Sequence, residues 1–187
     1  MSVLLCSEIL IAIYRFLPLL QNRLYMAKLY INKDIVADKD KMENWYLTGE
    51  EGLSFPDIQN FLSWIDPNDH VIDIEIHSCG GDAVEGYAIY DALRASGKQI
   101  SCTAVGRCAS MATVILLAAA KERRFAYPHA KFLIHKPYMA SYDGDLDLET
   151  LESIKSNLES EKNKMLALYV ERTGSEASVI EAQMNKA

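Results

Sequence analysis

Two short stretches of the sequence contain residue types that could carry out chemistry together. Residues 77–82 read HSCGGD, and residues 107–113 read RCASMAT. Two adjacent glycines, Gly80 and Gly81, let the backbone turn sharply and present N–H groups to a ligand, as an oxyanion hole requires. Ser110 stands at the predicted start of an apolar helix, near the positive end of the helix dipole. Together the two stretches suggest one site for nucleophilic catalysis.

A serine hydroxyl is a poor nucleophile unless a neighbouring base takes its proton. We assign this role to His135, which ends the predicted strand KFLIH, because α/β sheets place their sites at the carboxyl ends of the strands. His70, His77 and His129 compete for the role, although each stands beside a turn signal that predicts exposure. Spacing alone also fits structural roles, namely a turn at the glycines, a helix cap at Ser110 and a structural histidine.

The elements that would position these residues alternate between strands and helices. Apolar alternation and short apolar runs predict strands at 28–36, 71–76, 100–105, 124–127 and 131–135. Helical spacing of apolar residues predicts helices at 54–65, 83–96, 110–120 and 147–172, and a last helix from about residue 175. This order predicts an α/β fold with a largely parallel sheet.

The helices at 54–65 and 147–172 carry further signals. Ser54 and Asp57 have the spacing of a capping box, which predicts where the first helix begins. The long helix has an apolar stripe that should seat it on the core: Leu151, Ile154, Leu158, Met165 and Leu168. Its outer face mixes both charges, at Glu159, Glu161, Lys162 and Lys164, and could form ion pairs across a symmetric contact or simply be solvated.

Composition narrows the class of protein. The 187 residues are 50% hydrophobic and 24% charged, which is typical of one globular domain. A net charge of −7 without a basic cluster argues against a nucleic-acid partner. The chain has four cysteines, and they form no CxxC pair: Cys6, Cys79, Cys102 and Cys108. We therefore predict no metal and no cofactor. We expect most of the cysteines to be small core residues and the protein to work in a reducing, cytoplasmic setting.

The first 25 residues are a separate case. They are apolar, but Glu8, Arg15 and Pro18 interrupt them, so no stretch is long enough to span a membrane. A basic segment and a cleavage site, the marks of a secretory signal, are also missing. We predict that residues 1–25 are a leader outside the native fold and that the domain covers 26–187, beginning at Met26. The alternative is an amphipathic helix that docks on a partner.

Four ordered motifs resemble the proteolytic subunits of Clp proteases, the ClpP family. They are IEIHSCGGDAVEGYAIYDALRASG, GRCASMAT, RFAYPHAKFLIHKPY and LYVERTG. They are similar to the family's INSPGG…G.AIYD, GMAASMGA, RFALPNA..MIHQP and ELYAKHTG. The resemblance covers residues 70–187 well and 28–69 in outline. It is nearest to divergent members from phage genomes and their hosts.

The resemblance implies a serine peptidase that cleaves unfolded proteins. Ser110 would be the nucleophile and His135 the base, with an oxyanion hole from the backbone N–H groups of Gly81 and Met111. It also implies a crotonase-like fold of repeated β-β-α units with a long handle helix. Seven-membered rings, stacked in pairs, would enclose the sites in a chamber, which a Clp-type ATPase would supply with substrate.

Several positions depart from the family pattern. Cys79 replaces a proline, and Arg107 and Cys108 replace small or apolar residues; we interpret Cys108 as a packing residue. The loop at 139–147 is longer. The family's catalytic aspartate would fall at about Ala187, so the acid lies beyond this sequence, has been replaced, or lies elsewhere. Two other functions therefore stay open: a catalytically impaired structural subunit of such a ring, and a crotonase-type enzyme acting on an acyl-CoA.

Overall fold

A computed structural model of the chain describes residues 25–139, 142 and 144–186. Its centre is a five-stranded sheet in which every pair of neighbours is parallel. The strands are β1 (Met26–Ile31), β2 (Val71–Ser78), β3 (Gln99–Ala109), β4 (Arg124–Ala126) and β5 (Lys131–Leu133). The order is β1-β2-β3-β4, and β5 pairs with the last part of β3. The predicted α/β class with a parallel sheet is confirmed, and the finer description as repeated β-β-α units stays a prediction.

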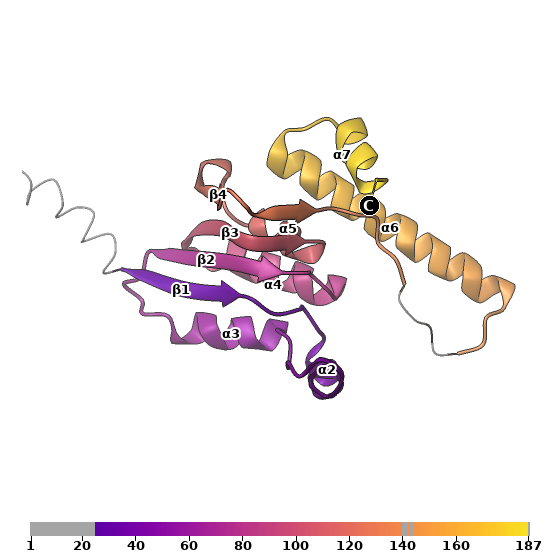
Figure 1. The fold of residues 1–187 in the computed structure, drawn as a ribbon, viewed down its shortest axis with the longest axis horizontal. Coiled ribbons are helices and arrows are strands. Elements are labelled where there is room, and N and C mark those ends of the chain that lie inside the picture. Colours follow the sequence, from indigo (N-terminus) through magenta and orange to yellow (C-terminus); the bar gives the residue numbers. More distant parts are fainter. Residues whose placement is uncertain (1–24, 140–141, 143, 187) are drawn as a thin grey trace, which may run out of the picture.

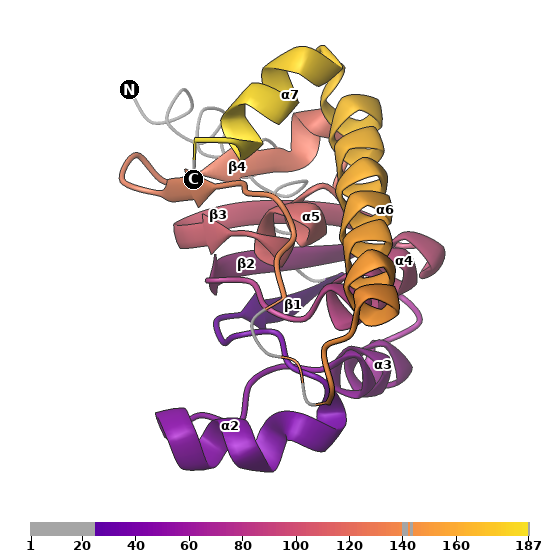
Figure 2. The ribbon, with the colours of Figure 1, turned by 90° about the vertical axis from the view of Figure 1, so that its right-hand side faces the viewer.

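The helices connect and cover these strands (Figures 1 and 2). They are α2 (Lys41–Thr48), α3 (Phe55–Trp64), α4 (Ala83–Ala95), α5 (Met111–Leu116), α6 (Leu148–Thr173) and α7 (Ala177–Met184), with short 3-10 turns at Asp38–Asp40 and Lys121–Arg123. In β2, Ile72, Ile74 and Ile76 are fully buried while the residues between them are half-buried. Side chains of a strand alternate between the faces of the sheet, so the core lies on the face that α4 and α5 cover.

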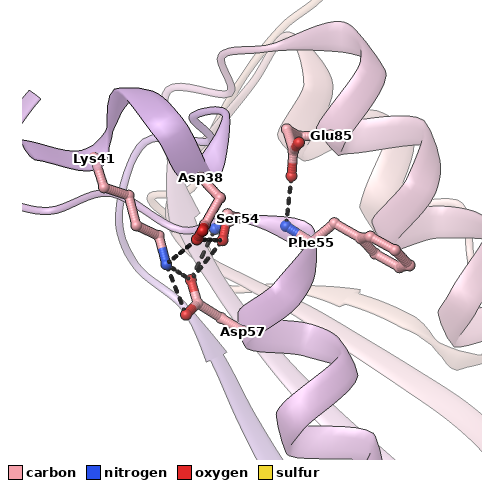
Figure 3. Close-up of polar contacts among 6 residues, drawn as sticks. All are labelled: Asp38, Lys41, Ser54, Phe55, Asp57 and Glu85. Atoms are coloured by element: carbon pink, nitrogen blue, oxygen red, sulfur yellow. Dashed lines mark hydrogen bonds and ion pairs between the residues drawn. The ribbon is translucent and has the colours of Figure 1, made fainter.

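The start of α3 is held by the predicted capping box and by a wider polar network (Figure 3). The Asp57 carboxylate accepts the Ser54 N–H at 2.9 Å. The Lys41 ammonium lies 2.7 Å from Asp57 and 3.1 Å from Asp38. A carboxylate of α4, that of Glu85, accepts the Phe55 N–H at 2.6 Å. The network therefore joins α2, α3 and α4 at one corner of the molecule.

Helix α2 was not predicted from the sequence. It buries none of its own residues, and Met42, Trp45, Tyr46 and Leu47 are exposed. Helices are predicted from a sequence by apolar residues that recur at helical spacing and form one buried face. The apolar residues of α2 do not form such a face. The helix is placed by its Lys41 anchor and ends at Gly49, whose φ of +80° is the usual helix-terminating conformation.

Several predicted elements differ in extent from the structure. The strand expected at 28–36 is observed at Met26–Ile31. The strand expected at 100–105 continues to Ala109, so Ser110 directly follows a strand. The helix expected at 110–120 is only Met111–Leu116, followed by turns, although it is buried nearly all round as predicted. The strand expected at 131–135 ends at Leu133, and His135 therefore lies beyond the strand rather than at its end.

The long helix was predicted correctly in length, but its apolar stripe is only partly seated. Of the predicted stripe, Met165 is buried and Leu151 is exposed. The other three members are half-buried: Ile154, Leu158 and Leu168. Figure 1 shows the reason, because the first half of α6 extends past the edge of the sheet. Stripe residues there have no core of their own chain to meet.

The charged residues of α6 also find partners within the chain. Lys162 pairs with Glu181 of α7 at 2.6 Å, and Lys164 lies 3.7 Å from the centroid of the Tyr87 ring. Both were expected on a face available for a symmetric contact. These two cations instead hold α6 against α7 and α4.

The predicted leader lies almost wholly outside the described residues, which begin at Tyr25. The first strand begins at Met26, where the domain was predicted to start. The domain boundary itself stays a prediction.

Candidate active site

The double-glycine loop and the serine are in direct contact. A Cβ atom placed on Gly80 would lie 2.7 Å from the Ser110 Cβ and 2.7 Å from the Met111 nitrogen. Only glycine allows this approach, and Gly80 also has a φ of +88°. The two stretches that the sequence placed thirty residues apart therefore form one site. They meet because β2 and β3 are parallel neighbours whose carboxyl ends lie side by side.

Ser110 has an unusual backbone conformation. Its φ of +52° makes it the only residue other than glycine with positive φ in the described part of the chain. Such a conformation costs about 1–3 kcal/mol and is found where a function requires it. The residue occupies a sharp turn between β3 and α5, as nucleophilic serines on strand-to-helix turns do.

Neighbouring elements hold this strained turn in place. The Ser110 N–H donates to the Leu133 carbonyl at 2.8 Å, and the Ser110 carbonyl accepts from the Thr113 N–H and hydroxyl at 2.9 and 2.6 Å. The Thr113 hydroxyl also forms a short hydrogen bond with the buried Tyr169 hydroxyl of α6. The side chain of Ser110 itself makes no cap hydrogen bond, so the sequence alternative of a helix cap at this residue is not observed.

Two backbone N–H groups near Ser110 have no acceptor within the described part of the chain. Among the hydrogen bonds of the described residues, none uses the N–H of Gly81 or of Met111. Gly81 has a φ of +141°, and a Cβ there would lie 2.0 Å from the Ile35 carbonyl oxygen, so the loop is packed against the segment after β1. Unpaired donors beside a nucleophile are what an oxyanion hole needs.

His135 lies on the chain that leaves β5, two residues beyond the carbonyl that Ser110 binds. Its Nδ1 is 2.7 Å from the Lys136 carbonyl oxygen. A carbonyl oxygen only accepts, so Nδ1 must carry a proton and Nε2 of the neutral ring is left as the basic nitrogen. In the described residues no hydrogen bond links His135 directly to the Ser110 hydroxyl.

The imidazole opens into a surface pocket that the last helix helps to form. The pocket is lined by residues that follow β5 and by the end of α7: Leu133, His135, Lys136, Pro137, Tyr138, Met184 and Asn185. The end of α7 therefore borders the histidine. Ala187, the position predicted for the acid, comes shortly after these residues but lies outside the described part of the chain.

The competing candidates have other environments. The Nδ1 of His77 accepts the Arg107 N–H at 3.2 Å, and His70 and His129 are exposed. Cys108 is buried, and burial raises the pKa of its thiol to about 12, so it stays protonated and inert. Of the cysteines expected in the core, Cys102 is also buried, but Cys79 is exposed beside Gly80.

Sequence reasoning missed the residues that support the turn. Thr113 and Tyr169 link the Ser110 carbonyl to α6, although they are far apart in the sequence. A threonine three residues after a turn is a weak local signal for such a bond. Tyr169 carries no local signal, because its partner is determined by how α6 packs on α5.

The described residues contain no helix that is both long and apolar enough to cross a membrane. Within the same residues, three or more His, Cys, Asp or Glu side chains nowhere gather as metal ligands would.

Comparison with known proteins extends these observations. The family profile described as "Clp protease" matches residues 57–187. "ATP-dependent Clp protease proteolytic subunit 1" of Chlamydia muridarum is 32% identical over 130 residues, which cover 67% of this chain and 65% of that protein. "ATP-dependent Clp protease proteolytic subunit" of Porphyromonas gingivalis is 37% identical over 102 residues, 52% of this chain and 46% of that protein. The chain thus spans less than two thirds of the length of these curated relatives.

Proposed function

Because the chain belongs to the Clp protease family, we propose that it is a serine-type endopeptidase that hydrolyses peptide bonds of unfolded proteins. The observation that carries this proposal is the strained Ser110 turn. It is packed against the double-glycine loop on one side and bonded to the strand that leads to His135 on the other.

In the proposed mechanism, the Ser110 hydroxyl attacks the peptide carbonyl while Nε2 of His135 takes its proton. The same proton then passes to the leaving amine. The N–H groups of Gly81 and Met111 stabilise the oxyanion, since they have no other acceptor among the described residues. The Lys136 carbonyl keeps the ring in the required tautomer. As a neutral acceptor it stabilises the imidazolium less than a carboxylate would.

We further propose that the subunits assemble into a closed chamber that an ATP-dependent unfoldase supplies. Support comes from the words "ATP-dependent" and "proteolytic subunit" in the names of the relatives. Leu148 and Leu151, which are exposed in the first half of α6, offer a surface for such an assembly. The described cysteines are all free thiols, which fits our proposal of a cytoplasmic location.

The test is labelling by a fluorophosphonate, which reacts with activated serines. We expect one adduct per chain, which fragmentation mass spectrometry assigns to Ser110 and not to Cys108. Labelling should vanish in Ser110→Ala and slow strongly in His135→Ala. It should persist in Ser101→Ala, the control, which changes a serine in the strand that precedes Ser110. An unlabelled wild-type protein would favour a non-catalytic ring subunit instead, and labelling that persists in Ser110→Ala would refute the assignment.

A further inference from the structure

Arg107 lies beside the double-glycine loop. It is exposed near the end of β3, three residues before Ser110. Its Nη1 donates to the Cys79 sulfur at 3.2 Å. Cys79 directly precedes Gly80, which touches Ser110. The guanidinium is therefore fixed next to the loop on which the carbonyl of a bound peptide would rest.

A second cation stands next to it in the sheet. Arg107 and Lys131 are register partners on β3 and β5. Residues opposite each other on neighbouring strands project from the same face, with Cβ atoms about 5 Å apart. Both residues are exposed. The two side chains therefore start from neighbouring positions on the strand pair whose far ends are Ala109 and Leu133.

Neither cation is neutralised by an ion pair within the part of the chain that the structure describes. Lys28, Lys41 and Lys162, by contrast, each contact a carboxylate. Two carboxylates stand near the loop. Asp82 is engaged, because it accepts the Glu85 N–H at 2.9 Å as the cap of α4. Asp34 interacts with Arg107 through space but forms no ion pair with it.

A free arginine fork binds a carboxylate through two parallel N–H bonds, and a neighbouring ammonium strengthens that attraction. Cys79 uses only one N–H of Arg107, so several donors stay available. The position beside the nucleophile makes a bound peptide the natural ligand.

We propose that Arg107 and Lys131 form a carboxylate-binding subsite, which selects peptides with an acidic group close to the bond that is cleaved. The acidic group is an Asp or Glu side chain or the free C-terminal carboxylate of the peptide. This inference rests on the proposed peptidase function and specifies its substrates.

Binding tests the subsite without turnover. In Ser110→Ala protein, fluorescence anisotropy would compare labelled apolar heptapeptides that carry Glu or Gln at each position in turn, with free or amidated C-termini. We expect the Glu peptide to bind about fivefold more tightly at one or two adjacent positions, and less so at high salt. A preference for the free over the amidated terminus would instead identify the C-terminal carboxylate as the ligand. The proposal would be overturned if each Glu peptide bound as tightly as its Gln counterpart and each free C-terminus as tightly as its amidated counterpart.

Matched variants test whether a preference for acidic peptides depends on Arg107 and Lys131. Adding Arg107→Gln should abolish the preference for Glu over Gln peptides, and adding Lys131→Gln should reduce this preference. Arg94→Gln is the control. It removes the same charge from the exposed end of α4 and should leave the preference for Glu over Gln peptides intact. A preference that survives Arg107→Gln would contradict the subsite. Failure of the proposed function would look different: Ser110-dependent hydrolysis would be missing for both members of every pair, whatever their binding.

Discussion

At the scale of single residues, the site depends on close backbone contact more than on side-chain hydrogen bonds. Ser110 is held in a costly conformation by bonds to its own N–H and carbonyl, and Gly80 packs against it where no Cβ fits. The proposed nucleophile is thus placed before any substrate binds. Such preorganisation requires the loop and the turn to stay in contact.

Substituting Gly80 should therefore disturb both stability and reactivity. An alanine Cβ would lie 2.6 Å from the Ala109 carbonyl oxygen, and the φ of +88° adds strain. We expect Gly80→Ala to lower the free energy of unfolding by about 2–4 kcal/mol and to slow fluorophosphonate labelling at least tenfold, as measured by urea denaturation and by labelling rates.

Gly97→Ala is the matched control, because Gly97 has a similar φ of +70° but open space around its Cα. It should lose only about 1 kcal/mol and label at the wild-type rate. Equal effects of both substitutions would mean that the contact between Gly80 and Ser110 is unimportant.

At the scale of elements, the corner where α2 meets α3 is held by charge. Burial alone would raise the pKa of Asp57, but the Lys41 ammonium and the Ser54 N–H outweigh it and hold the pKa below its ordinary value. The same contacts raise the pKa of Lys41 despite its burial. An ion pair of this kind contributes stability only while both members are charged.

The stability of this corner should therefore fall in acid. The lowered pKa of Asp57 makes its contribution complete above the ordinary carboxyl pKa of about 4, and the contribution is lost as the pH falls through the lower pKa of the folded state. We expect Asp57→Asn to be less stable than wild type at pH 7, with a difference that shrinks as the pH falls from 4 to 2.5. Thermal unfolding across this range would measure it, and a difference independent of pH would rule out the ion pair as the cause.

At the scale of the whole molecule, α6 carries apolar residues that its own chain leaves uncovered. Its stripe is buried at Met165 but exposed at Leu151, where the helix extends past the sheet (Figure 1). If the chamber is formed, this half of α6 lies against another subunit. Light scattering should then report a particle far larger than the 21.0 kDa chain.

Placing a charge on the exposed stripe should weaken that assembly. We expect Leu151→Glu to shift the particle towards smaller species at micromolar concentration, with little change in the thermal stability of the subunit, because Leu151 touches little of its own core. Ser153→Glu adds the same charge on the opposite side of the helix and should leave the size unchanged. A wild-type protein that is a monodisperse monomer would contradict the chamber.

The sequence by itself determined the fold class, the start of α3 at its capping box, and the length of α6. It also singled out Gly80, Gly81 and Ser110. These features are written in local signals, since periodicity, caps and glycines act within a few residues. The family followed from the same motifs, whose order and spacing survive along the chain.

Only the tertiary structure decided how these residues meet. Contact between Gly80 and Ser110 follows from the parallel pairing of β2 with β3, and the support of Thr113 by Tyr169 follows from where α6 packs. Helix α2 is held by the ion pairs of Lys41 with Asp57 and Asp38, and its sequence has no buried face that would reveal it. The exposure of Leu151 depends on where the sheet ends. Each of these properties relates segments that are distant in sequence. It is determined by how those segments pack, which no local sequence pattern encodes.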